Sequence, residues 1–267
     1  MTTYFHENNA VYDHRFNRFF TLTAMIFWPL AYYLLENKKT KNCLLLAGCL
    51  LLICIFSESA ATVFALLTSV GVFMIAFFLP RAGMILVMVG TILMTYLMPW
   101  LASIGLRLTT PMRDTLPKGE IISRLEIWQA ISTMIAENPV LGWGYRTSRQ
   151  VYDLFYTQNP DVQLLVKGTT SHPHNNILEY WTELGVIGVS LWLGVMLSVL
   201  WRIKDLPNKT KAFALATFIS YQAIAQVAYG AGQANWLAQT CFAVIVAGVI
   251  FAPRPTPQVD RSGAPSA

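Results

Sequence analysis

The amino-acid sequence predicts an all-α, polytopic bundle of about seven transmembrane helices, with a helical extracytoplasmic loop region between the fourth and fifth spans. The chain is 55% hydrophobic and only 12% charged, whereas an ordinary soluble domain is about 25% charged. Its apolar runs are long enough to cross the roughly 30 Å hydrocarbon core as helices, which satisfy their backbone hydrogen bonds internally. The sequence lacks the alternating strands, each about ten residues long, of a membrane β-barrel.

Seven apolar runs are the predicted spans, and the second is short for a membrane crossing. They cover residues 19–35, 43–57, 62–79, 84–106, 183–201, 212–230 and 236–252. The four cysteines, Cys43, Cys49, Cys54 and Cys241, all lie inside these runs. Their spacing fits neither a disulfide framework nor a zinc site, so we interpret them as small hydrophobic side chains.

The distribution of basic residues predicts the orientation, because short cytoplasmic loops are enriched in Lys and Arg. With the N-terminus outside, the Lys- and Arg-rich segments 36–42 and 202–211 face the cytoplasm. The long segment 107–172 is then outside the cytoplasm, which is the periplasm in a Gram-negative cell. Residues 1–252 are treated as one transmembrane domain, and the Pro-rich residues 253–267 as a disordered cytoplasmic tail. The net charge of +5 says little about nucleic acid, because the charges are dispersed among loops. From the apolar spans we expect a lipid bilayer, and no nucleic acid, as partner.

An amphipathic helix is predicted over residues 120–137 of the long segment, ended by Asn138-Pro139. Its apolar side comprises Ile121, Leu125, Ile127, Trp128, Ile131 and Ile135, and its polar side Ser123, Glu126, Gln129, Thr133 and Glu137. Arg124 falls on the apolar side. Its side chain either reaches past apolar surface to lipid phosphates or turns inward, where a guanidinium can hold a diphosphate with paired hydrogen bonds.

The stretch Ser171-His172-Pro173-His174-Asn175-Asn176 precedes the fifth span. Because proline favours the first helical position, we expect a helix to begin at Pro173. His174 would then lie in the first turn, on one stripe with Leu178, Trp181 and Gly185. A positive helix terminus opposes protonation of the imidazole, which favours a neutral ring able to accept a proton. The alternative is a histidine with only a capping or interfacial role.

Other polar residues carry weaker signals. Glu58 lies at the outer end of a span, either as a functional acid or as an interfacial carboxylate. The glutamines could line a polar cavity or form inter-helix hydrogen bonds; they are Gln222, Gln226, Gln233 and Gln239. His172 and His174 have no clustered carboxylates near them in sequence, so we predict no metal and no cofactor.

Two ordered motifs resemble the O-antigen ligase/polymerase family of bacterial inner-membrane glycosyltransferases. In the first, His174-Asn175 is followed after nine residues by Gly185-Val-Ile-Gly188. In the second, Arg124 is followed by Trp128 and by the turn Pro139-Val-Leu-Gly142-Trp-Gly144. Asn17-Arg18 and Trp28-Pro29 also resemble the middle of the family's membrane region. The resemblance covers about residues 15–250.

The resemblance implies a metal-independent ligase that moves a glycan from undecaprenyl diphosphate to a sugar hydroxyl of lipid A-core in the periplasm. His174 matches the family's essential histidine, proposed to deprotonate the acceptor. Arg124 matches a loop arginine proposed to hold the diphosphate. We also expect His172, Asn175 and Arg146, from the same part of the chain, to bind substrate.

Two alternatives stay open: a polymerase of the same family that extends O-antigen or exopolysaccharide, and a non-catalytic truncated membrane module. A transporter is disfavoured because the charges cluster at span ends and in the outer segment. The sequence also departs from the family. Ser57-Glu58-Ser59 stands where the family often has an arginine, and the chain is expected to be an N-terminally truncated member.

Overall fold

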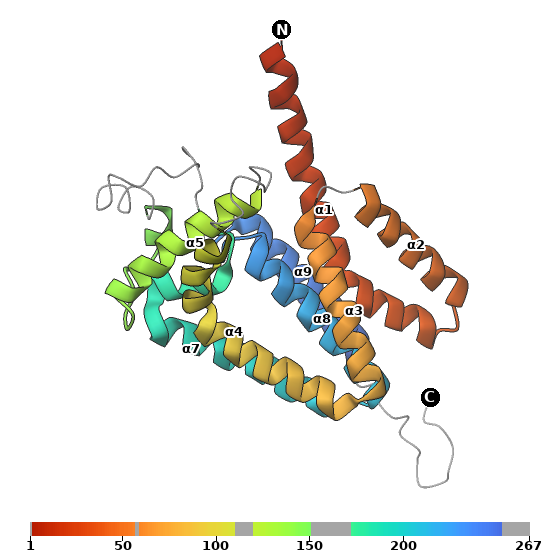
Figure 1. Ribbon diagram of the computed structural model, residues 1–267. Helices are drawn as coiled ribbons and strands as arrows, with labels where there is room; N and C mark the ends of the chain where they lie inside the picture. The colour runs from red at the N-terminus through yellow and green to blue at the C-terminus, as the bar shows by residue number, and fades with distance from the viewer. Residues whose placement is uncertain (1, 57–58, 110–119, 151–171, 253–267) are drawn as a thin grey trace.

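The computed structural model describes residues 2–56, 59–109, 120–150 and 172–252, and within these ranges the regular structure is entirely helical (Figure 1). The helices are α1 (Thr2–Glu36), α2 (Thr40–Phe56), α3 (Ala60–Phe78), α4 (Pro80–Thr109), α5 (Glu120–Glu137), the 3₁₀ turn η2 (Thr147–Arg149), α7 (Asn176–Lys204), α8 (Asn208–Val227) and α9 (Ala234–Phe251). All seven predicted spans therefore lie largely within helices, and the predicted helix of the long segment is α5. The predicted tail 253–267 lies outside the described residues.

Five of the helices are long and apolar enough to cross a membrane, against about seven expected. The apolar part of α2, Thr40–Ile55, is shorter, and α8 is not among the five. Helix α8 contains Lys209, Lys211 and several glutamines, yet most of its residues are buried. Because protein neighbours rather than lipid surround such a helix, polar side chains within it are tolerated. The chain is thus a multi-pass membrane protein.

Helix α8 is the centre of the bundle and contacts α1, α3, α4, α7 and α9. Helix α4 leads to α5, which packs on both α4 and α7 (Figure 1). Helix α2 projects from the side of the bundle beside α1 (Figure 1). Four of its leucines, Leu44, Leu45, Leu51 and Leu52, are exposed. Lipid can cover such an apolar surface in a membrane protein, so its exposure is consistent with a bilayer environment.

Aromatic side chains join α1, α3 and α8. The ring of Trp28 stacks on Phe73 with centroids 4.7 Å apart, and Phe213 packs edge-on against Phe73 at 4.8 Å. The indole N–H of Trp28 donates a 2.9 Å hydrogen bond to Ser69 Oγ, which satisfies its one polar group. This cluster fixes α1 against the central helices.

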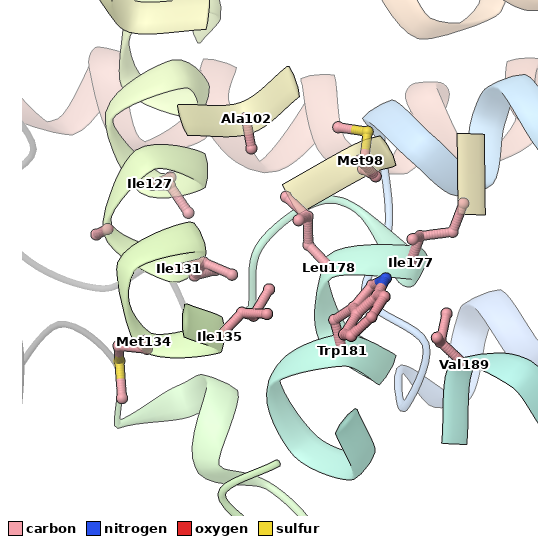
Figure 2. Packing of buried hydrophobic residues seen from close by; sticks show 11 residues of the cluster. Met98, Ala102, Ile127, Ile131, Met134, Ile135, Ile177, Leu178, Trp181 and Val189 are labelled. Carbon is pink, nitrogen blue, oxygen red and sulfur yellow. The ribbon is translucent and has the colours of Figure 1, made fainter. Parts of the chain in front are cut away.

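Helix α5 spans Glu120–Glu137, which confirms the predicted bounds 120–137. Its isoleucines Ile127, Ile131 and Ile135 are buried against α4 and α7 in the cluster of Figure 2. The prediction for the polar side was wrong at Glu126, whose side chain is only 3% exposed. The physical reason is that α5 contacts two helices, so more than one of its faces is covered.

Helix α7 begins at Asn176, so the predicted start at Pro173 was wrong. Asn175 is the N-cap: its side-chain oxygen accepts a 2.9 Å hydrogen bond from Leu178 N. Asparagine is among the best N-cap residues because it satisfies a backbone N–H that has no partner inside the helix. His174 therefore precedes the helix and does not share a helical stripe with Leu178 and Trp181.

Candidate active site

A cavity of about 300 Å³ lies among the middle of α1, the first turns of α3 and α5, the segment before α7 and the turn between α8 and α9. It is lined by Arg18, Thr21, Ser59, Ala60, Ala61, Arg124, His172, His174, Ala228, Tyr229, Gln233 and Asn235. The structure thus brings together three of the five predicted site residues: Arg124, His172 and His174. Among the described residues, the lining includes no carboxylate.

Arg124 and His174 are both hydrogen-bonded to the end of α8. Arg124 Nη1 donates to the carbonyl oxygen of Val227, the last residue of that helix. His174 Nδ1 lies 3.0 Å from the carbonyl oxygen of the next residue, Ala228. The final carbonyl groups of a helix have no partner within it, so they are available as acceptors for side chains. One short backbone segment therefore orients both groups.

The contact of His174 with Ala228 determines the tautomer of a neutral ring. A carbonyl oxygen can only accept, so Nδ1 carries the hydrogen and Nε2 carries the lone pair. The backbone of His174 has φ +53°, a left-handed conformation that is uncommon for residues other than glycine. Strained conformations of this kind concentrate at functional sites, where the surrounding structure enforces them.

His172 lies next to His174, with ring centroids 4.1 Å apart. The amide nitrogen of Gln233 lies 3.1 Å from His172 Nε2 and can donate a hydrogen bond to it. Gly230 packs behind the same ring: a Cβ at Gly230 would lie 2.8 Å from His172 Cβ. The turn between α8 and α9 therefore positions both histidines.

Glu179, in the first turn of α7, holds this turn in place. Its buried carboxylate accepts hydrogen bonds from Ala231 N at 2.8 Å and from Gly232 N at 3.4 Å. From α1, Thr21 Oγ1 lies 2.9 Å from the hydroxyl of Tyr229. The turn that contacts His172 and His174 is thus attached to α7 through two backbone N–H groups and to α1 through the Tyr229 hydroxyl.

The two glycine motifs pack against each other. Gly142 and Gly185 have φ of +69° and +62°, and a Cβ at Gly185 would lie 2.7 Å from Gly142 N. Backbone hydrogen bonds join the same segments, from Trp143 N to Thr182 O and from Val186 N to Pro139 O, both 2.8 Å. Only glycine allows this close backbone approach. The motifs therefore fix the end of α5 against α7. They thereby limit how far α5, which carries Arg124, can shift along its axis relative to α7.

The other two predicted site residues do not line the cavity. Asn175 is fully buried; besides capping α7, its Nδ2 donates a 3.0 Å hydrogen bond to the carbonyl of Gln226. Arg146 is exposed beyond the end of α5, with its guanidinium carbon 5.7 Å from the centre of the Tyr145 ring. Their substrate contacts stay predictions, and Asn175 has a structural role in any case. Glu58 lies outside the described residues.

Of the four glutamines, Gln233 lines the cavity. Gln239 Oε1 lies 3.1 Å from Thr21 Oγ1, between α9 and α1, and Gln226 Oε1 accepts a hydrogen bond from Ile177 N. Gln239 and Gln226 therefore form contacts between helices, which was the alternative to lining a cavity.

Sequence reasoning missed Arg18 and the turn between α8 and α9. Arg18 entered the sequence analysis only in the resemblance of Asn17-Arg18 to the family's membrane region, without a role in the site. The turn contributes mainly backbone carbonyl and N–H groups, which every residue type carries and which leave no signal in a sequence. The glutamine at position 233 was the one available indication of a polar lining there.

Comparison with known proteins identifies a family and several relatives. The family model described as O-Antigen ligase matches residues 45–193. A proposed polysaccharide ligase of Rickettsia bellii is 29% identical over 241 residues, which cover 87% of this chain and 57% of that protein. A second, from Rickettsia conorii, is 26% identical over 239 residues, with the same coverage of both chains.

No solved structure is significantly similar to the chain. The chain spans just over half the length of these relatives, at 57%. The family model matches more than half of the chain and includes Arg124, His174 and both glycine motifs. The chain belongs to the O-antigen ligase family.

Proposed function

We propose that this chain transfers a glycan from undecaprenyl diphosphate to a sugar hydroxyl of lipid A-core, on the periplasmic face of a bacterial inner membrane. The observation that carries the proposal is the attachment of Arg124 and His174 to consecutive carbonyl groups beside one cavity. A cation for the leaving group and a base for the nucleophile are then held together. These are the two groups that the transfer needs.

His174 acts as the general base in this proposal. Its Nε2 takes the proton of the acceptor hydroxyl while that oxygen forms a bond to the anomeric carbon of the donor glycan. The bond between the anomeric carbon and the diphosphate oxygen breaks, and its electron pair leaves with the diphosphate. The hydrogen bond from Nδ1 to Ala228 keeps the ring in the tautomer that can accept this proton.

Arg124 stabilises the diphosphate as it leaves. A guanidinium has five N–H donors in a planar fork, so it can hold a carbonyl oxygen with one and phosphate oxygens with others. The bond to Val227 keeps the group in place before the donor arrives, which reduces the ordering cost of binding. Charge that develops on the leaving group is then stabilised by a group already oriented.

The comparisons favour a ligase over a polymerase, because the matching family and the relatives are all described as ligases. The test is transfer by the purified full chain in lipid vesicles, with an undecaprenyl-diphosphate glycan and lipid A-core. Glycan attached to lipid A-core is the expected product. Glycan that lengthens on the carrier would identify a polymerase instead, and absence of both products would contradict an enzymatic role.

A further inference from the structure

We propose that Arg18 is a second phosphate-binding residue of this cavity, and that it makes the site select a lipid diphosphate over a lipid monophosphate. The inference rests on the proposed function, since it assigns a further residue to the same donor site. It comes from the placement of Arg18 and from the charge of the cavity lining.

Arg18 lies in α1, in the part Arg18–Glu36 that is long and apolar enough to cross a membrane, and it lines the cavity together with Arg124. The residue is exposed, and within the described part of the chain its guanidinium forms no hydrogen bond or ion pair. Its backbone carbonyl accepts a 3.0 Å hydrogen bond from Thr21 Oγ1. The side chain thus retains its donors for a ligand in the cavity.

The two arginines approach the cavity from different helices. Arg124 comes from α5, whereas Arg18 comes from α1 and shares the cavity lining with the start of α3. The small residues Ser59, Ala60 and Ala61 line the cavity at the start of α3, so no large side chain from that segment fills the space beside Arg18. A ligand with two anionic groups can therefore be held from two sides.

The turn between α8 and α9 joins the segments that carry the two arginines. Thr21, one helical turn after Arg18, contacts the hydroxyl of Tyr229 at 2.9 Å and Gln239 Oε1 at 3.1 Å. Arg124 is bonded to Val227 at the beginning of the same turn. Because both attachments end within residues 227–229 or on the adjoining helix, the backbone segments that carry the two arginines are held relative to each other, and the exposed Arg18 side chain can extend from its segment to the ligand.

The charge of the lining matches a diphosphate. The described lining contains two arginines and no Asp or Glu, so these two cations can attract an anion. A sugar linked to lipid through a diphosphate carries one negative charge on each phosphate, which corresponds to the two guanidinium groups. A sugar linked through a single phosphate leaves one arginine without a partner in a cavity of about 300 Å³.

The experiment measures binding of undecaprenyl diphosphate and of undecaprenyl monophosphate to the full chain in lipid nanodiscs. Wild type should bind the diphosphate more tightly. In Arg18→Gln the affinity for the diphosphate should fall about tenfold, the usual effect of losing one hydrogen bond to a charged group, while the affinity for the monophosphate changes much less. Arg18→Lys should lie between the two, because it keeps the charge and loses the planar fork.

Arg81→Gln is the matched control, since Arg81 is an exposed arginine just beyond the other end of α3 and does not line the cavity. It should bind both lipids as wild type does. In transfer assays Arg18→Gln should raise KM for the donor and leave KM for the acceptor unchanged.

Equal losses for the two lipids in Arg18→Gln, or no loss for either, would overturn the inference. Binding is measured without transfer, so failures of the two proposals can be told apart. A wild type that discriminates through Arg18 but transfers no glycan supports the role of Arg18 and contradicts the proposed function.

Discussion

Arg124 and His174 are far apart in the sequence but are held by neighbouring carbonyl groups, those of Val227 and Ala228. The two side chains come from different elements, α5 and the segment before α7, and meet only at the end of α8. Displacement of that helix end would move both groups together. The geometry of the pair therefore depends on one short backbone segment.

His174→Ala should abolish glycan transfer while membrane insertion and expression stay normal, because the variant removes the proposed base. General base catalysis contributes a factor of about 10²–10⁴. His174→Gln is the sharper variant, since its amide can still donate to Ala228 but cannot accept the proton at neutral pH. Both are compared by surface glycan in cells and by transfer in vesicles, and wild-type glycan in either variant would exclude the base role.

Arg124→Lys should lower transfer about a hundredfold, an effect comparable to removing one donor to the developing charge. An ammonium group retains the charge, but it cannot hold the Val227 carbonyl and phosphate oxygens with the same planar fork. Steady-state kinetics with varied donor would check this. Near-normal transfer would favour the alternative from the sequence, a side chain directed to lipid phosphates.

Gly185→Ala should lower the free energy of unfolding by about 1–3 kcal/mol, the usual cost of placing a side chain in a glycine-only conformation. Gly185 has φ +62° and ψ −161°, and an added Cβ would contact the backbone of the Gly142 segment. Gly194→Ala, on the same helix, has nothing within 4 Å of its Cβ and should change stability by less than about 1 kcal/mol. Thermal unfolding in detergent tests the pair, and equal effects would refute the close approach.

Asn175→Ala should lower the free energy of unfolding by about 1 kcal/mol, because the N-cap of α7 is lost. Asn175→Ser should recover part of this loss, since its hydroxyl can accept from Leu178 N. Unfolding and donor KM are measured together. A raised KM without any loss of stability would instead support the substrate contact expected from the sequence.

Much of the fold could be predicted because its signals are local. The bounds of α5 followed from the period of its apolar residues and from Asn138-Pro139, and the structure gives Glu120–Glu137. The family motifs identified Arg124 and His174 because both stand at defined spacings from glycines. Burial of Glu126 could not be predicted, since a periodic pattern cannot reveal that a second helix covers the same segment.

By itself, the sequence determined that this chain is a helical membrane protein and which arginine and histidine to consider, because apolar length and motif spacing are properties of contiguous residues. Only the tertiary structure decided that α7 begins at Asn176, that Arg18 shares the cavity, and that the end of α8 orients Arg124 and His174. The physical reason is that these features depend on backbone groups and helix packing between distant segments. Such contacts have no residue-type signature along the chain.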